Sequence, residues 1–210
     1  MLTKIGKLLL VYLYERMTGR LPADKTLTKV FLHHMSVSQN PSSAQSSSTT
    51  EIYVVGAAST GKTTLCQALF TRLGLEGPEF VVEVARDIMK SHGFTRDDVG
   101  SMAMQMAIMN EQFSRETKSR EAAASSGRVL LSDRSAVDAV VYAAITSTND
   151  EEAEQRFRSL TDSHRFQLAL SAYRRALVIL LAPVPEWLED DLIRMIDKQV
   201  RTGSSHNLAF

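Results

Sequence analysis

The sequence predicts an α/β fold with a mostly parallel sheet and helices on both faces. Four short apolar segments alternate with longer stretches of helical periodicity, and they lie at 52–55, 80–84, 129–133 and 176–181. Strands that alternate with helices in this way generally pair in parallel. The chain has 210 residues, 44% of them hydrophobic, which suffices for one domain with a sizeable core. A glycine-rich stretch directly after the first apolar segment also supports this fold class.

The first strand runs directly into that glycine-rich loop. Residues 52–55 are apolar and mostly β-branched, which favours a strand. The residues that follow match the pattern G-x-x-x-x-G-K-[ST] in full. They are Gly56, Ala57, Ala58, Ser59, Thr60, Gly61, Lys62 and Thr63, followed by Thr64. Leu65, Leu69 and Leu73 then recur at helical spacing, so a helix is expected to begin near Lys62.

This loop pattern is typical of phosphate binding, and we expect ATP as the ligand. Gly56 and Gly61 can adopt positive φ angles, which lets consecutive backbone N–H groups turn toward an anion. The helix N-terminus contributes only about 0.3–2 kcal/mol, which is too little to hold a nucleotide. The Lys62 ammonium and a Mg²⁺ ion on the Thr63 hydroxyl are expected to supply the rest. The alternative is a glycine-rich turn with an incidental lysine.

A long helix is expected in the middle of the chain. Thr95 is a suitable N-cap, and the helix should run to about Ser125. One apolar stripe should face the core, and it comprises Val99, Met102, Met106, Met109 and Phe113. The region 151–175 is predicted to be a broken helix. Its expected buried residues are Phe157, Leu160, Phe166, Leu170 and Tyr173.

Charged residues follow the second and third strands. Glu83 lies near the end of the second strand, and Arg86 opens the helix after it. The third strand ends at Asp133, a Walker B arrangement, and Arg134 and Asp138 follow. Ligands of parallel sheets bind beyond the carboxyl ends of the strands. We therefore expect the glycine-rich loop, Glu83 and Asp133 to converge in one crevice.

The residue types at this crevice suit phosphoryl transfer. Mg²⁺ prefers hard oxygen ligands, which Thr63 and Asp133 supply. Glu83 can accept a proton from a substrate hydroxyl, and Arg86 or Arg134 can clamp a phosphate or a substrate. Each residue also has a structural alternative: Glu83 as an ordinary strand-end carboxylate, Arg86 paired with Glu83 or Asp87, and Arg134 paired with Asp138.

The two N-terminal regions differ from the domain expected over 51–200. Residues 1–35 are basic with apolar residues at helical spacing, which predicts an amphipathic helix. A mitochondrial presequence, a membrane-surface helix and an ordinary helix all fit that pattern. Residues 36–50 are rich in Ser and Thr and carry no charge, so a disordered linker is expected. Residues 201–210 are expected to be a loose tail.

The bulk composition excludes several classes of protein. Lys and Arg total 24, as do Asp and Glu, and zero net charge argues against a dedicated nucleic-acid-binding protein. Cys66 is the single cysteine, which excludes an intramolecular disulfide and favours a reducing, cytoplasmic compartment. A buried apolar role is expected for Cys66. No apolar run approaches the roughly 18 residues that span a membrane.

At these motifs the sequence resembles the NadR-type AAA domain family, over about residues 52–188. The resemblance rests on the loop at 56–65, on Glu83-Val-Ala-Arg86, and on Asp133-Arg-Ser-x-x-Asp138 with Tyr142 four residues on. It implies a three-layer α/β/α P-loop NTPase fold and the phosphorylation of a nucleoside-like acceptor, such as nicotinamide riboside. The motif pair is also similar to that of deoxynucleoside kinases. By that likeness Glu83 would be the base, Asp133 the metal-side acid and Arg134 a clamp.

The sequence departs from this family after the fourth strand. Residues 190–194 replace an Asp-Gly-x-Arg-like segment before the lid, and the candidates for the lid cation are Arg194, Lys198 and Arg201. The last strand of the fold is expected to be missing, which would leave a sheet edge bare. Two alternatives to a kinase follow: a nucleotide-dependent switch or trafficking module that binds lipid or protein, and a truncated, inactive relative.

Overall fold

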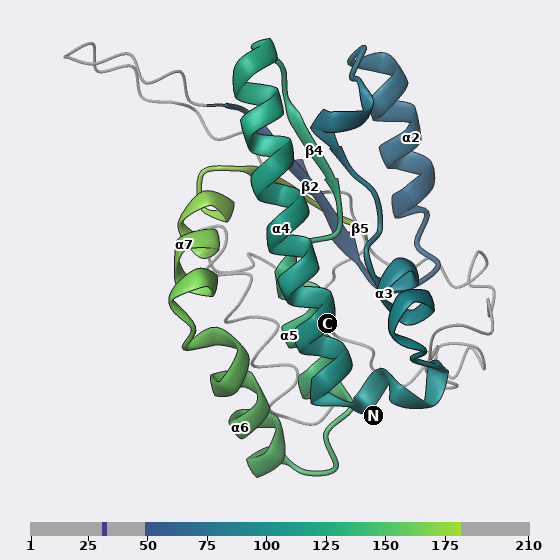
Figure 1. Cartoon of the computed structure of the whole chain (residues 1–210), viewed down its shortest axis with the longest axis vertical. Coiled ribbons are helices and arrows are strands. Elements are labelled where there is room, and N and C mark those ends of the chain that lie inside the picture. Colours follow the sequence, from purple (N-terminus) through teal and green to yellow (C-terminus); the bar gives the residue numbers. More distant parts are fainter. Residues whose placement is uncertain (1–30, 33–48, 182–210) are drawn as a thin grey trace.

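The computed structural model describes residues 31–32 and 49–181 (Figure 1). The helix predicted near the N-terminus, most of the predicted linker, the tail and the lid-cation candidates Arg194, Lys198 and Arg201 lie outside these residues. Within the region 1–35, the two described residues form a short strand. No helix in the described ranges is long and apolar enough to cross a bilayer.

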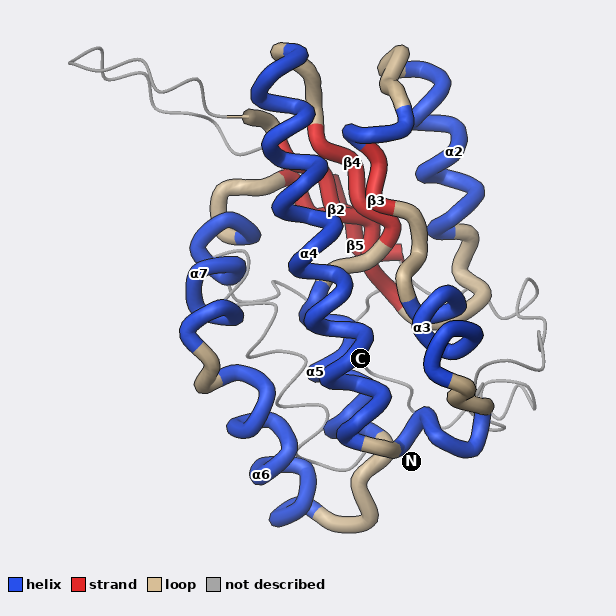
Figure 2. The backbone as a smooth tube through the Cα atoms, viewed as in Figure 1, coloured by secondary structure: helices blue, strands red, loops and turns tan. Residues whose placement is uncertain are grey.

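One sheet runs through the middle of the domain (Figure 2). Its strands are β1 (Phe31–Leu32), β2 (Glu51–Gly56), β3 (Phe80–Val81), β4 (Leu130–Asp133) and β5 (Leu177–Leu181). Their spatial order is β1-β5-β2-β4-β3. β5, β2, β4 and β3 are parallel, which confirms the predicted sheet. β1 pairs antiparallel with β5, and any strand after β5 would lie outside the described residues.

Helices cover both faces of this sheet (Figures 1 and 2). They are α2 (Lys62–Arg72), α3 (Ala85–His92), α4 (Met102–Ser126), α5 (Ala136–Ile145), α6 (Asp150–Thr161) and α7 (His164–Tyr173). Side chains alternate along β2, as a pleated strand requires. Ile52 and Val54 pack with Cys66 of α2, whereas Tyr53 packs on the opposite face with residues of α4, α5 and α7. The two clusters make the predicted three-layer α/β/α fold.

Cys66 has the buried, apolar surroundings that were expected. Burial raises the pKa of its thiol to about 12, because the thiolate would lose its hydration. The thiol therefore stays protonated at neutral pH and serves as packing against the sheet.

β3 is shorter than the strand predicted at 80–84. It lies at the sheet edge, pairs with β4 and ends at Val81. Val82 is 46% exposed, and Val84 already has helical backbone angles as the residue before α3. The chain leaves the sheet after two paired residues, so Glu83 lies in a turn and not in the strand.

The long helix begins later than predicted. Thr95 caps a 3₁₀ turn over Arg96–Gly100, in which the Thr95 N–H donates to the Asp98 carboxylate at 2.7 Å. Ser101 then has an extended backbone, and its hydroxyl accepts the Met104 N–H at 3.1 Å to begin α4. A second cap thus interrupts what the sequence pattern presents as one helix.

The apolar stripe predicted for α4 is partly wrong. Met109 and Phe113 are buried as predicted, and Val99 is buried from the 3₁₀ turn, but Met106 is 45% exposed. The buried face of α4 also carries polar side chains, at Gln105, Gln112 and Glu116, which displace the core-facing stripe from the Met106 position. The broken helix predicted at 151–175 is confirmed as α6 and α7, and the residues buried there as predicted are Leu160, Phe166, Leu170 and Tyr173.

A buried polar network joins α4 and α7. Glu116 is 1% exposed and accepts hydrogen bonds from the Gln112 amide at 2.9 Å and from the Tyr173 hydroxyl at 2.8 Å. The Tyr173 oxygen in turn accepts the N–H of Ala136, at the start of α5, at 3.2 Å. Burial raises the pKa of the Glu116 carboxyl to about 7, because the carboxylate is removed from water.

Glu116→Gln should flatten the pH dependence of stability. Between the ordinary pKa of 4.5 and the raised value of about 7, the unfolded chain has released this proton while the folded chain still holds it. The unfolding free energy therefore falls as pH rises through this window, by up to about 1.4 kcal/mol per pH unit, and this contribution levels off above it. Urea denaturation of both proteins across the window measures the difference. Equal slopes would contradict a raised pKa for Glu116.

Gly56→Ala should destabilise the fold strongly. Gly56 ends β2 with a φ of +142°, and a Cβ atom there would clash with the carbonyl oxygen of Leu181 in β5. Strain and displacement of β5 together should cost roughly 3 kcal/mol or more. Gly74→Ala is the matched control, because Gly74 has a φ of +60° but open space at its Cβ position; it should cost about 1 kcal/mol. Thermal unfolding compares the two, and similar losses would contradict the clash.

Candidate functional site

The glycine-rich loop joins β2 to α2 through several left-handed residues. The φ angles are 142° at Gly56, 59° at Ser59 and 82° at Gly61, which is the residue before α2. Left-handed residues in a tight loop turn neighbouring N–H groups toward a common point, as in anion-binding nests. Of the other predicted loop residues, Ala58 is buried, and Thr64 lies exposed in the first turn of α2.

Lys62 lies across this loop. Its side chain is almost fully buried, and its ammonium donates to the Ala57 carbonyl and to the Thr60 hydroxyl, the latter at 3.2 Å. The Thr60 hydroxyl also donates to the Ala57 carbonyl, at 3.0 Å. The loop therefore holds a positive charge directly over its own backbone, where it can face a phosphate.

Thr63 and Asp133 meet at the same end of the sheet. The parallel register of β2 and β4 places Val54 opposite Asp133, and Val54 lies two residues before the start of the loop at Gly56. The Thr63 hydroxyl donates to Asp133 Oδ2 at 2.6 Å. The predicted convergence of the loop with the end of the third strand is therefore present in the structure.

The Asp133 carboxylate is short of hydrogen-bond donors. The residue is 1% exposed, and within the described part of the chain Oδ1 has no hydrogen-bond partner. Burial raises the pKa of Asp133, and the nearby Glu83 carboxylate adds to the rise, while Thr63, Arg134 and Lys62 oppose it. A buried oxygen without a donor is the kind of group that a cation stabilises.

The Thr63 hydroxyl and the Asp133 carboxylate suit Mg²⁺ better than a metal whose ligands all come from the protein. Among residues 49–181 no three His, Cys, Asp or Glu side chains gather into a metal-binding group. Mg²⁺ is commonly held by one or two protein oxygens, with substrate phosphates and water as its other ligands. The Thr63 hydroxyl and Asp133 Oδ1 satisfy that requirement.

Arg134 follows Asp133 in a strained conformation. Its φ is 86°, which costs a non-glycine residue about 1–2 kcal/mol. Neighbours hold both of its backbone groups: the N–H donates to the Val54 carbonyl at 2.9 Å, and the carbonyl accepts from the Ser132 hydroxyl at 2.8 Å and from the Gln112 amide at 3.3 Å. The turn directs Asp133 and Arg134 to different partners although they are adjacent in the sequence.

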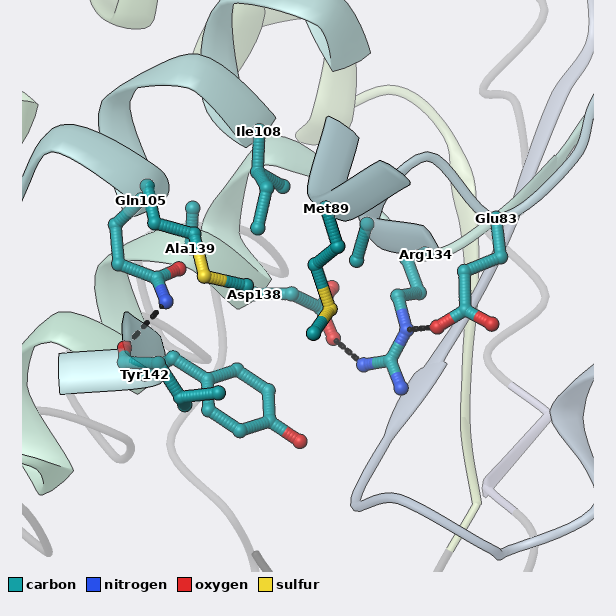
Figure 3. A pocket seen from close by; sticks show the side chains of 11 residues that line it. Glu83, Met89, Gln105, Ile108, Arg134, Asp138, Ala139 and Tyr142 are labelled. Carbon is teal, nitrogen blue, oxygen red and sulfur yellow. Dashed lines mark hydrogen bonds and ion pairs between the residues drawn. The ribbon is translucent and has the colours of Figure 1, made fainter. Parts of the chain in front are cut away.

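The Arg134 guanidinium bridges two carboxylates. Its Nε atom lies 3.0 Å from Glu83 Oε1, and its Nη1 atom lies 2.9 Å from Asp138 Oδ1 (Figure 3). The Nη2 atom is buried and lacks a hydrogen-bond partner among the described residues. The predicted structural pairing of Arg134 with Asp138 exists, and the unpaired Nη2 leaves one donor for another group.

Glu83 and Asp138 are each shared between two partners. The second Glu83 oxygen lies 3.2 Å from Arg86 Nε, on a side chain that is 55% exposed, so the expected Glu83–Arg86 pair is present. Asp138 Oδ2 accepts the Ser135 N–H at 3.0 Å and caps α5. Asp138 therefore holds the turn and Arg134 together, whereas Arg86 is the more exposed of the two arginines that pair with Glu83.

A pocket opens beside these ion pairs (Figure 3). Glu83, Arg134 and Asp138 line one part of it, and Met89, Ile108 and Tyr142 line another. The surface that the pocket exposes is mainly apolar, and the ion-paired side chains of Glu83, Arg134 and Asp138 lie at one end of it. Neither the phosphate-loop residues nor Asp133 line this pocket, but Asp133 directly precedes Arg134, which does.

The residues that hold the turn after β4 are not predictable from the sequence pattern. Gln112 and Ser132 both contact the Arg134 carbonyl, and Glu116 anchors Gln112. Hydrophobic periodicity gives no signal for them, because polar residues on a helix are expected to face water. A Ser beside the strand-end Asp is the one local sign, since Ser hydroxyls commonly bond a carbonyl two residues away.

Comparison with known proteins identifies the family. A sequence model described as an AAA domain matches residues 51–208 of the chain. No curated protein and no solved structure matches the chain. The matched region contains the loop, the parallel sheet and the Thr63–Asp133 contact described above. The chain belongs to this AAA domain family of P-loop proteins.

Proposed function

We propose that the chain binds ATP with Mg²⁺ and transfers the terminal phosphoryl group to a hydroxyl of a small, nucleoside-like acceptor. The observation that carries the proposal is the 2.6 Å contact between Thr63 and Asp133 at the end of a complete phosphate loop. A loop alone binds phosphate. The loop together with a strand-end carboxylate and an adjoining pocket has the parts that phosphoryl transfer requires.

The donor half of the site consists of the loop, Lys62, Thr63 and Asp133. The loop N–H groups and the Lys62 ammonium face the β- and γ-phosphates. Thr63 and Asp133 would hold Mg²⁺, which neutralises charge on the phosphate oxygens when bound. The Thr63–Asp133 hydrogen bond holds the hydroxyl and the carboxylate next to each other. Little reorganisation of these two groups is therefore needed when a cation binds.

The acceptor half consists of Glu83, Arg134 and the pocket wall. Glu83 is suited to accept the hydroxyl proton. The Nη2 donor of Arg134, which has no partner within the described part of the chain, is suited to bind the acceptor or the transferred phosphoryl group. Arg86 occupies one oxygen of Glu83. Because Arg86 is half exposed, it can move away when a substrate hydroxyl approaches, whereas Arg134 is buried and fixed.

The double pairing of Glu83 also supports a second candidate function. A carboxylate held by two arginines is a weak proton acceptor until one of them leaves. In that case the chain would bind nucleotide without transferring phosphate, as a nucleotide-dependent switch or trafficking module, or as an inactive relative. Lipid binding by such a module rests on residues 1–35, of which only residues 31–32 are described.

The likeness to NadR-type domains guides the choice of acceptors. ATP consumption should be measured on the full chain with Mg²⁺ and a panel of nucleosides that includes nicotinamide riboside, with GTP as an alternative donor. Consumption that depends on one acceptor supports the kinase. Hydrolysis that no acceptor stimulates would reject the kinase and favour the switch, and the absence of any nucleotide-induced thermal shift would indicate an inactive relative.

Lys62→Ala should abolish stabilisation by ATP. A ligand at 100 times its Kd stabilises the folded state by about 2.7 kcal/mol, or roughly 5–10 °C for a domain of this size. Without the Lys62 ammonium the phosphates lose their main cationic contact. Differential scanning fluorimetry with Mg·ATP measures the shift, and Lys118→Ala, at an exposed position on α4, is the control. A wild-type shift in Lys62→Ala would show that the loop is not the binding site.

Glu83→Gln should separate binding from transfer. The amide keeps the size of the side chain but cannot take a proton, so the Mg·ATP thermal shift should remain while acceptor-dependent turnover falls by about 10²–10⁴-fold. Glu111→Gln, which removes a carboxylate paired with Arg115 on the outer part of α4, is the control. Unchanged turnover in Glu83→Gln would remove Glu83 from the mechanism.

A further inference from the structure

The turn after β4 depends on a side chain from a different layer of the fold. Gln112 of α4 is 2% exposed and reaches the Arg134 carbonyl with its amide nitrogen at 3.3 Å. The same nitrogen lies 3.0 Å from Ser132 Oγ, whose own hydroxyl donates to that carbonyl at 2.8 Å. Two donors from two elements therefore meet at one carbonyl oxygen.

The orientation of the Gln112 amide is fixed by its surroundings. The Arg134 carbonyl can only accept a hydrogen bond, and the Glu116 carboxylate, 2.9 Å from the same nitrogen, accepts as well. The NH₂ group must therefore face both. Glu116 is held in turn by the Tyr173 hydroxyl of α7 at 2.8 Å. Rotation of the Gln112 amide would remove one donor from each of these buried acceptors and turn its own carbonyl oxygen toward them, which is costly.

This contact lies where Asp133 of the donor half is followed directly by Arg134 of the acceptor half. Arg134 has a left-handed backbone, with Asp133 before it directed to Thr63 and its own side chain directed to Glu83 and Asp138. If the Arg134 carbonyl lost a partner, the turn could relax toward an ordinary φ. Both the Asp133 carboxylate and the Arg134 guanidinium would then change direction.

We propose that Gln112 is a positioning residue for the Asp133–Arg134 turn and thereby sets the Mg²⁺ dependence of nucleotide binding. The inference rests on the proposed function, since it concerns the same Thr63–Asp133 oxygens. Gln112 contacts neither Thr63 nor the Asp133 side chain in these hydrogen bonds and acts through the backbone of Arg134. Groups that orient the ligands of a metal typically change metal affinity by about 10–100-fold when they are removed.

A second buried glutamine on the same helix provides a matched control. Gln105 is also 2% exposed, and its amide also donates to a backbone carbonyl, that of Val99, at 2.7 Å. Gln105→Met removes one amide–carbonyl bond, whereas Gln112→Met removes the bonds to Arg134, Ser132 and Glu116, and both variants keep a side chain of similar length. Gln112→Met should therefore lose more stability, so the comparison is made on the ratio of ATP affinities with and without Mg²⁺ within each folded protein.

The experiment measures the Kd of ATP for the full chain with Mg²⁺ and with EDTA, for the wild type and both variants. We expect Gln112→Met to lose about tenfold or more of the affinity gain that Mg²⁺ provides, while its affinity for metal-free ATP changes little. Gln105→Met should keep the wild-type ratio. Gln112→Asn, which keeps the amide but is one methylene too short to reach, serves as the second variant if Gln112→Met does not fold.

Amide hydrogen exchange supplies a readout that needs no nucleotide. Residues 133–138 should exchange faster in Gln112→Met than in Gln105→Met, because the turn has lost a partner. A folded Gln112 variant with the wild-type ratio of affinities and unchanged exchange in the turn would overturn the inference while leaving ATP binding in place. A wild-type chain that binds ATP equally with and without Mg²⁺ would reject the proposed metal site, and the inference with it.

Discussion

The pairing of β2 with β4 is the constraint on which the site depends. Their parallel register sets Val54 beside Asp133, so the chain that leaves β2 as the phosphate loop starts next to the carboxylate that ends β4. α2 then presents Thr63 from its first turn, and the hydroxyl reaches Asp133 at 2.6 Å. A shift of one residue in this register would turn the carboxylate to the opposite face of the sheet. Such a shift would also disrupt the packing on both faces of the sheet, where Tyr53 lies in one buried cluster and Val54 in the other.

The residues at the proposed site have features that lower the stability of the fold. Among the described residues, one buried oxygen of Asp133 has no donor and one buried nitrogen of Arg134 has no acceptor. Arg134 also has a left-handed backbone, which a glycine would adopt without strain. Such features persist when the surrounding structure determines them fully, and they concentrate at functional sites. Here the surroundings are the sheet bond to Val54 and the contacts from Ser132 and Gln112.

The sequence predicts the parts of this site that local chemistry determines. The loop motif and the apolar strand that ends at Asp133 both depend on residues within a few positions of each other, and parallel pairing then requires them to share one sheet edge. The interruption of the broken helix predicted at 151–175 also has a local cause in the structure, where the Ser163 side chain accepts the Phe166 N–H and caps α7. Such features follow from hydrophobic periodicity and local sequence motifs, without knowledge of tertiary contacts.

Features determined by contacts between layers were not predictable. The start of α4 was missed because Thr95 and Ser101 are both good caps, and the choice between them depends on how the 3₁₀ turn packs. Gln112 and Glu116 were missed because polar residues on a helix are normally exposed. The early end of β3, which places Glu83 in a turn, follows from its position at the sheet edge.

A crystal structure of the chain with Mg²⁺ and a non-hydrolysable ATP analogue would show whether Thr63 and Asp133 hold the metal. We expect the β- and γ-phosphates over the 56–63 loop and the metal bonded to Thr63 Oγ1 at about 2.1 Å, with the Asp133 carboxylate reaching it directly or through one water. Nucleotide bound elsewhere, or a metal held without Thr63 and Asp133, would contradict this expectation.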